Sequence, residues 1–207
     1  MLVEVRQTET FQAWLEDLKD ERACRKIAQR IVRLQAGLLG DVKFFDGIGE
    51  LRIDTGPGYR VYFVKRGDVL IILLSGGDKS TQTNDIKKGQ ENGFRFGVRS
   101  MPIKTTPFDA AKYLDTHESQ AELIEDALET GNAAYVAAAL GTVARTHSMT
   151  KIARDAGVTR EALYKALSDQ GDPRLSTLLG VVHALGFSLG VRPIPGDQSN
   201  VPHAASR

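Results

Sequence analysis

Cysteine, histidine and long apolar runs are scarce in this sequence of 207 residues. The single cysteine, Cys24, excludes an internal disulfide, and the 4 histidines lack the spacing of a metal site, so we expect no metal and no cofactor. The longest apolar run, at 69–74, is too short to cross a bilayer, and residues 1–25 contain no apolar core of a signal peptide. We therefore expect a soluble, cytoplasmic protein without membrane contact.

An excess of either charge is also missing, since 27 lysines and arginines face 26 aspartates and glutamates. Any nucleic-acid surface must therefore be a local patch. Residues 1–100 hold 17 basic against 14 acidic residues, and residues 101–207 hold 10 against 12. The first part is slightly basic and the second slightly acidic, which permits mutual attraction.

The first part alternates strand and helix patterns. A short strand at 2–7 precedes two amphipathic helices, the second of which Asp20 can cap. Strand-like segments separated by glycine-containing turns then follow at 50–54, 59–66 and 69–74, and the last is apolar enough for a central strand covered on both faces. A short polar helix is expected at 84–92. The pattern predicts an α+β domain, a small antiparallel sheet with two N-terminal helices.

The second part is almost wholly helical. Ser119 has the capping-box spacing that begins a helix, and Gly131 ends it. An alanine-rich helix follows at 133–145, and Asp172 with Pro173 predicts the start of another, which stops near Gly186. The pattern predicts an all-α bundle.

The change of pattern sets the predicted domain boundaries. We place a first domain at 1–92, a linker at 93–107, a helical domain at 108–192 and a disordered tail at 193–207. The two domains are expected to fold as independent globules that pack against each other.

Residues 149–167 have the pattern of a helix-turn-helix. Ala153 supplies the small residue where two helices touch, and Gly157 supplies the turn at which the backbone becomes left-handed. Thr159 caps the second helix and so brings its N-terminus close to DNA, where Arg160 can read guanine. The candidate DNA-binding residues are Thr150, Thr159, Arg160, Glu161, Tyr164 and Lys165.

The second part resembles the addiction module antidote family, HigA-like antitoxins with a Cro/repressor-type helix-turn-helix. The resemblance rests on TPFDAAKYL at 106–114, AALG at 138–141 and REALYKALS at 160–168. It implies a homodimer, operator binding with autorepression, and neutralisation of a partner toxin.

The first part is similar to the matching addiction module killer family, which is HigB-like and lies within the RelE/ParE group. The similarity rests on ELRID at 50–54, GPGYRVYF at 56–63 and LSGGDKSTQ at 74–82. Together the two resemblances imply a type II toxin–antitoxin module in one chain. Neutralisation within one chain and exchange between two chains both stay open.

Most RelE/ParE toxins are endoribonucleases that cut ribosome-bound mRNA. Attack by a 2′-hydroxyl requires the developing charge to be neutralised and a proton to be moved. The resemblance makes Arg60 the first candidate for binding the scissile phosphate, with Arg52 and Lys79 completing a cationic cluster. Proton transfer has no clear residue, and its candidates are Tyr59, Tyr62 and Asp85.

Other interpretations remain. The first part resembles gyrase-inhibiting toxins as well as ribonucleases, and it is also compatible with a degenerate, non-catalytic domain attached to a transcriptional repressor. An acidic stretch could mask the cationic cluster of the toxin. Its members are Asp115, Glu118, Glu122, Glu125, Asp126 and Glu129.

Overall fold

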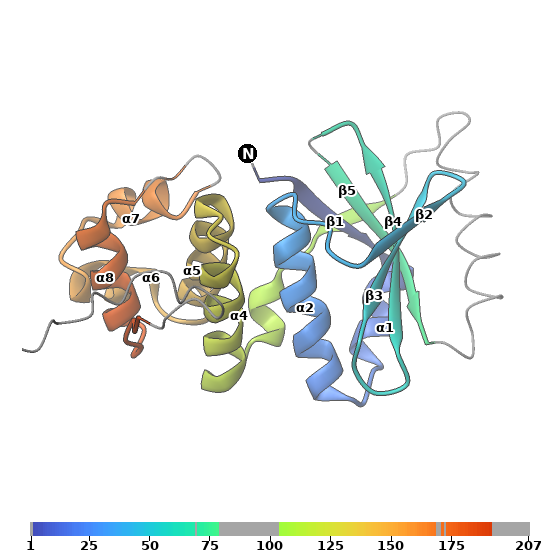
Figure 1. Cartoon of the computed structure of the whole chain (residues 1–207), viewed down its shortest axis with the longest axis horizontal. Helices are drawn as coiled ribbons and strands as arrows, with labels where there is room; N and C mark the ends of the chain where they lie inside the picture. Colours follow the sequence, from blue (N-terminus) through green and yellow to red (C-terminus); the bar gives the residue numbers. More distant parts are fainter. Residues whose placement is uncertain (1, 69, 79–103, 169–170, 172, 192–207) are drawn as a thin grey trace, which may run out of the picture.

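The computed structural model describes residues 2–68, 70–78, 104–168, 171 and 173–191 (Figure 1). The strands are β1 (Glu4–Thr8), β2 (Val42–Phe45), β3 (Ile48–Ile53), β4 (Tyr59–Arg66), β5 (Leu70–Gly77) and β6 (Thr105–Pro107). The helices are α1 (Glu9–Glu16), α2 (Glu21–Gln35), the 3-10 turn η1 (Ala110–Tyr113), α4 (His117–Glu129), α5 (Ala133–Thr146), α6 (Met149–Asp155), α7 (Arg160–Ala166) and α8 (Leu175–Ala184). A sheet with two helices thus precedes a helical region, as the sequence predicts.

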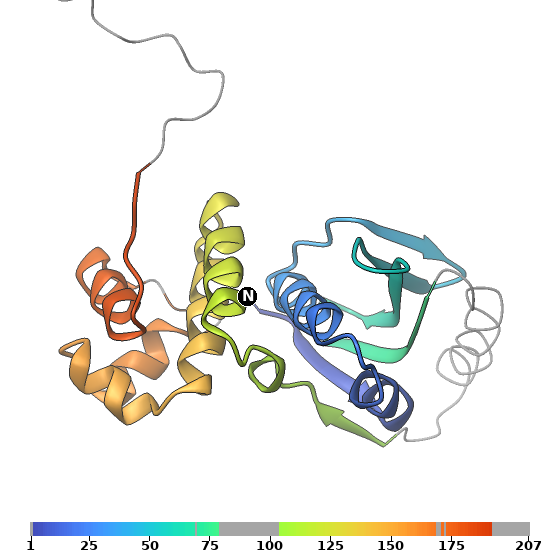
Figure 2. The same ribbon diagram turned by 90° about the horizontal axis from the view of Figure 1, so that it is seen from below.

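The strands form one sheet in the order β2-β3-β4-β5-β1-β6. The β1–β5 pair is parallel and the other pairs are antiparallel, so the sheet is mixed rather than purely antiparallel. The predicted central strand, β5, does lie inside the sheet, between β4 and β1. Helices α1 and α2 pack on one face of the sheet, which we call the helix face (Figure 2). Neither of these helices covers the other face, on which Ile48, Tyr62 and Leu74 form a separate buried cluster.

Local sequence explains the two helices. The side chain of Thr8 accepts a hydrogen bond from Phe11 N and caps α1, and Asp20 accepts one from Ala23 N and caps α2. The predicted role of Asp20 is therefore confirmed. Each cap satisfies an amide that would otherwise lack a partner within the helix.

Two glycines let aromatic rings lie directly on the helix face. A β-carbon at Gly76 would stand 2.1 Å from the ring of Trp14 in α1, and one at Gly49 would stand 2.3 Å from the ring of Phe63. Both separations are far below van der Waals contact. Glycine at these positions is therefore a packing requirement of the sheet.

Strand β6 lies within the predicted linker. Of residues 93–107, residues 104–107 are described, and three of them pair with β1 in the register Arg6↔Pro107 to Thr8↔Thr105. The Nε of Arg6 also donates to Thr105 Oγ1 at 2.7 Å. This segment is thus the edge strand of the sheet, which pattern alone did not indicate because three residues are too few to show alternation.

The helical region differs from the prediction mainly at helix starts. Thr116, rather than Ser119, caps α4, and α8 begins at Leu175, two residues beyond Pro173, with no side-chain cap. The predicted helix at 84–92 and the tail at 193–207 lie outside the described residues. No helix among the described residues is long and apolar enough to span a membrane.

The buried apolar residues of the two parts form one continuous cluster, in contrast to the two independent cores expected. The reason lies in α2. Ile27 and Ile31 on this helix are accompanied by the equally buried Ala28 and Val32. Helix α2 packs against α5 and η1 as well as against the sheet, so it is buried from two sides.

Replacing Gly76 by alanine tests the packing on the helix face. We expect Gly76→Ala to lower the free energy of unfolding by about 1–3 kcal/mol, because the new methyl group overpacks the contact with Trp14. Urea unfolding measures the change. Gly190→Ala is the matched control, since a β-carbon there meets no atom within 4 Å. Equal stability of the two variants would contradict this explanation.

Candidate functional site

Two of the predicted catalytic residues lie side by side on the sheet. Arg52 of β3 and Arg60 of β4 are directly paired across the strands, and Glu50 is paired with Tyr62 in the same way. Because residues two apart on a strand share a face, these four side chains share the face of the sheet opposite α1 and α2. We call this group the arginine face.

Glu50 organises the arginine face. Its Oε1 accepts a hydrogen bond from Arg52 Nε at 2.9 Å and lies 3.4 Å from Arg60 Nε. The Glu50 side chain is 1% exposed, against 41% for Arg52 and 13% for Arg60. Glu50 is not among the catalytic residues that the sequence predicts. The alternation of Glu50 with Arg52, opposite Arg60, is the signal that could have identified it.

The other predicted catalytic residues do not join this group as exposed side chains. Tyr62 belongs to it but is fully buried, so its hydroxyl is not open to solvent. Tyr59 is buried on the helix face, where its ring lies 6.5 Å from that of Trp14. Lys79 and Asp85 lie outside the described residues. A proton-transfer residue therefore stays unassigned.

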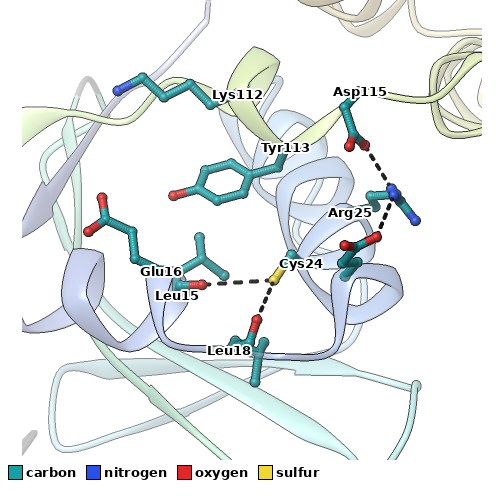
Figure 3. Close-up of a pocket in the computed structure, with 9 residues that line it drawn as sticks. Leu15, Glu16, Leu18, Cys24, Arg25, Lys112, Tyr113 and Asp115 are labelled. Carbon is teal, nitrogen blue, oxygen red and sulfur yellow. Dashed lines mark hydrogen bonds and ion pairs between the residues drawn. The ribbon is translucent and has the colours of Figure 1, made fainter.

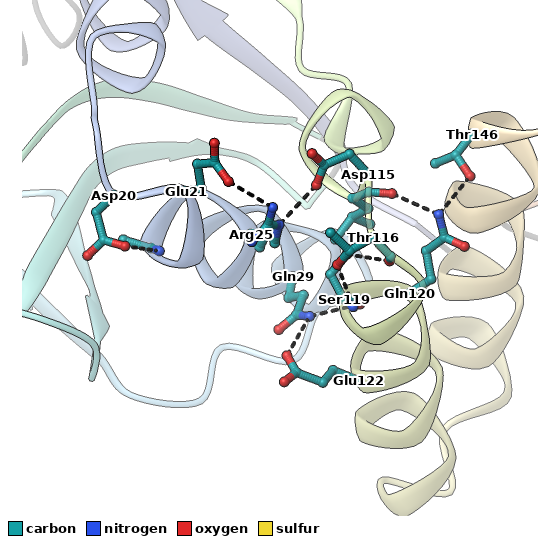
Figure 4. Close-up of polar contacts among 12 residues, drawn as sticks. Asp20, Glu21, Arg25, Gln29, Asp115, Thr116, Ser119, Gln120, Glu122 and Thr146 are labelled. Atoms are coloured by element: carbon teal, nitrogen blue, oxygen red, sulfur yellow. Dashed lines mark hydrogen bonds and ion pairs between the residues drawn. The ribbon is translucent and has the colours of Figure 1, made fainter.

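A second polar group joins the two parts of the chain. Basic residues on α2 face acidic residues at and before α4, and we call this contact the seam (Figure 4). Its ion pairs are Arg25 Nε–Asp115 Oδ1 at 2.9 Å, Lys26 Nζ–Glu122 Oε2 at 2.7 Å and Arg33 Nη1–Asp126 Oδ1 at 2.8 Å.

Buried hydrogen bonds reinforce the seam. Gln29, which is 8% exposed, donates from Nε2 to the Ser119 carbonyl at 3.0 Å and to Glu122 Oε2 at 3.2 Å. The hydroxyl of Tyr135 in α5 donates to Asp126 Oδ2 at 2.6 Å, while Arg33 binds the other oxygen of that carboxylate. Burial and the neighbouring Asp126 raise the pKa of the Tyr135 phenol, which therefore stays protonated as the donor.

The ion pairs of the seam also change the pKa values of two of its carboxylates. The hydrogen bond from Arg25 lowers the pKa of Asp115, and the hydrogen bond from Lys26 lowers the pKa of Glu122. Both carboxylates are therefore held in the charged form at neutral pH.

Acidic residues of the predicted stretch do bind basic residues of the first part, but at a different place from the predicted cationic cluster. Asp115, Glu122 and Asp126 do bind cations of the first part, but those cations lie on α2 and not on the arginine face. Helix α2 lies between the helical region and the sheet in both views (Figures 1 and 2). The arginine face is on the far side of that sheet.

A cavity of about 200 Å³ opens at one end of the seam, between α1, α2 and η1 (Figure 3). The Cys24 thiol lines it and lies 3.6 Å from the Leu18 carbonyl oxygen. Burial raises the pKa of this thiol, so it is protonated and a poor nucleophile. Among the described residues, no group of histidine, cysteine and carboxylate side chains could hold a metal ion.

The third group is the pair of short helices α6 and α7. Gly157 stands between them with φ of 70°, and the Thr159 side chain caps α7 by accepting from Ala162 N at 3.1 Å. Ile152, Ala153 and Leu163 are buried where the pair packs. The predicted turn and cap are thus both present.

All of the candidate DNA-binding residues on this pair are exposed. The Arg160 guanidinium carbon lies 5.4 Å from the centre of the Tyr164 ring, and both side chains face solvent. Helices α7 and α8 lie at the end of the molecule farthest from the sheet (Figure 1). This surface and the seam are therefore at different sides of the helical region. The exposed candidates are Thr150, Thr159, Arg160, Glu161, Tyr164 and Lys165.

Known proteins resemble parts of this chain. Residues 104–193 match the family model described as probable addiction module antidote protein. An uncharacterized protein of Haemophilus influenzae is 55% identical over 91 residues, which are 44% of this chain and 92% of that protein. A second uncharacterized protein of the same organism is 40% identical over 85 residues, 41% of this chain and 88% of that protein. No solved structure matches the chain.

The matched segment begins one residue before β6 and contains the acidic side of the seam and the α6–α7 pair. Through residues 104–193, the chain belongs to the family of probable addiction module antidote proteins.

Proposed function

We propose that the chain is a cytoplasmic toxin–antitoxin module in which residues 104–193, the antidote part, restrain the α/β part and bind operator DNA. The seam is the observation that carries this proposal. Three cations of α2 each bind a carboxylate of the antidote part, at 2.7 to 2.9 Å. An antidote must bind another folded unit, and the seam is a contact of that kind. With both units in one chain, the partner concentration is of millimolar order for a flexible connection, or two chains exchange partners.

The α/β part is proposed as a RelE/ParE-like toxin that cleaves ribosome-bound mRNA. The support is the arginine face, where the guanidinium groups of Arg52 and Arg60 share the Glu50 carboxylate and Arg52 also lies 3.8 Å from Asp41 Oδ1. Arg60 and Arg52 would bind the scissile phosphate and neutralise the charge that develops on it. Lys79 remains part of this proposal. Tyr62 would have to become exposed before it could contact a substrate.

A second candidate is a transcriptional repressor whose α/β part no longer catalyses. Its support is the burial of Tyr62 and the pairing of Arg60 with Glu50, which limit the access of a substrate to these two candidate side chains. Toxicity of the α/β part distinguishes this candidate from the first.

The antidote part is proposed to bind operator DNA as a homodimer through a helix-turn-helix formed by α6 and α7. The capped N-terminus of α7 presents Arg160 for guanine, with Thr159 and Lys165 near phosphates. Thr150 lies in the first turn of the preceding helix, and Tyr164 supports the Arg160 guanidinium. Glu161 completes the exposed set.

Arg160→Ala should weaken operator binding by about 1–3 kcal/mol, because it removes a base contact. A gel-shift titration of the full chain on its own promoter DNA measures the loss. Lys112→Ala removes one positive charge from η1, away from the α6–α7 pair, and should leave the affinity within error. Unchanged affinity of the Arg160 variant would show that this residue does not contact the operator bases.

Residues 1–92 expressed alone in bacteria should arrest growth and cleave mRNA, and co-expression of residues 101–207 should relieve the arrest. Arg60→Ala in residues 1–92 should abolish toxicity through loss of the phosphate contact. Lys65→Ala, an exposed cation on the same strand, is the control. Normal growth with soluble residues 1–92 would favour the non-catalytic repressor instead.

Acid should weaken the seam. The pKa values of Asp115 and Glu122 are lower in the folded chain, so their contribution is complete above the ordinary carboxyl values of about 4 and is lost as the pH falls through the lowered values. Hydrogen exchange of α4 amides from pH 6 to pH 3 measures the effect. The Asp115→Asn, Glu122→Gln double variant should lose this dependence, and Glu118→Gln on the same helix should keep it. An identical pH profile in the double variant would show that other groups control the seam.

A further inference from the structure

We propose that the side of α2 facing the antidote part is a docking site for structured RNA, which the antidote part covers in this structure. The proposal rests on the proposed toxin function and adds a second RNA contact, separate from the arginine face. We call this surface the basic stripe. Its members are Arg22, Arg25, Lys26, Gln29 and Arg33.

The basic stripe is a continuous row along α2. Residues spaced by three, four or seven positions share one side of a helix, so the row runs from Arg22 to Arg33. At 1.5 Å per residue it extends over about 16 Å, long enough to contact several phosphates of one strand. The row contains four cations and the amide donor of Gln29, all of which can bind phosphate oxygens.

The antidote part meets this row with carboxylates, much as a backbone would meet it with phosphates. Asp115, Glu122 and Asp126 each place an oxygen within 2.9 Å of a cation of the stripe. Glu122 also accepts the hydrogen bond of Gln29 and is influenced by the charge of Arg22. Every member of the stripe that could bind phosphate is thus engaged by or close to an acidic group of the antidote part.

The place where the antidote part packs is the reason to infer a second RNA contact on the α/β part. The antidote part packs on α2 and pairs with the β1 edge, whereas the arginine face lies on the opposite side of the sheet. An antidote placed there cannot restrain the α/β part by touching Arg52 or Arg60. It can do so by occupying the surface with which that part holds its RNA target.

RNA fits the stripe better than an acidic protein segment does. The same part of the chain carries two further arginines on another face, Arg52 and Arg60, of which Arg52 is 41% exposed, so one long polyanion could contact both surfaces. A short acidic segment would satisfy the stripe alone. We therefore assign RNA and make an acidic peptide a competing outcome of the test.

The test uses the full chain with Arg160→Ala and Lys165→Ala, which remove nucleic-acid binding by α7. In this parent, the substitutions Asp115→Lys, Glu122→Lys and Asp126→Lys reverse the charges with which the antidote part covers the stripe, so that like charges repel along the seam. We call this set the reversed cover. Fluorescence anisotropy with a labelled RNA hairpin should show binding at least about tenfold tighter than that of the parent, and more sensitive to salt. The milder set Asp115→Asn, Glu122→Gln and Asp126→Asn should change affinity in the same direction.

Two controls distinguish RNA binding by the stripe from RNA binding by the lysines that the substitutions introduce. Arg25→Glu, Lys26→Glu and Arg33→Glu open the seam by repulsion between acids and should give no gain in RNA affinity. The reversed cover combined with Arg25→Ala, Lys26→Ala and Arg33→Ala keeps the lysines and should also lose the gain.

The inference is overturned by any of three results. These are no gain in either cover variant, an equal gain in either control, or tight binding of a poly-glutamate peptide in place of the hairpin. A gain that persists with Arg52→Ala and Arg60→Ala supports the stripe as a separate site. Since RNA cleavage is not scored, failure of the ribonuclease proposal in growth assays is distinguishable from failure of this one.

Discussion

The carboxylate of Asp126 joins the two parts of the chain, because each of its oxygens binds a different part. One of its oxygens binds Arg33 of the α/β part, and the other accepts the hydroxyl hydrogen of Tyr135 in the antidote part. Tyr135 is fully buried, so loss of Asp126 would leave its hydroxyl away from water, at a cost of about 1–3 kcal/mol. This arrangement holds α4 against α2, along which the ion pairs of Arg25 and Lys26 also form.

The seam also determines what the molecule can do at the same time. It uses α4 and the turn before it, whereas the proposed DNA surface is on α7, at the end of the molecule farthest from the sheet (Figure 1). The α/β part therefore does not occupy the exposed side of α7. Under the proposed function, an intact chain could bind an operator while its α/β part stays restrained, and dimeric binding would depend on half-site spacing rather than on release of the toxin.

Sequence pattern predicted the elements that local chemistry determines. Strand β4 has the bounds expected from alternation, and Asp20 caps α2 as predicted. The seam was not predictable in the same way, because a pairing such as Arg33 with Asp126 depends on how elements 93 residues apart meet. Strand β6 was missed for a similar reason, since its identity comes from pairing with β1. The acidic stretch was recognised, but only the packing of α4 on α2 decides which cations it meets.

Glu50 illustrates the same limit within the candidate catalytic group. A carboxylate that is 1% exposed would ordinarily be a costly residue in a strand, and nothing in the pattern ELRID indicates that it is buried. Its burial becomes acceptable once the register brings Arg52 and Arg60 to the same oxygen. Asp41, whose Oδ1 lies 3.8 Å from Arg52 Nη1, is a second carboxylate beside the two arginines. Glu50 therefore holds the two guanidinium groups together on one face of the sheet, while Arg52, 41% exposed, stays open to solvent and so to an anion under the proposed function.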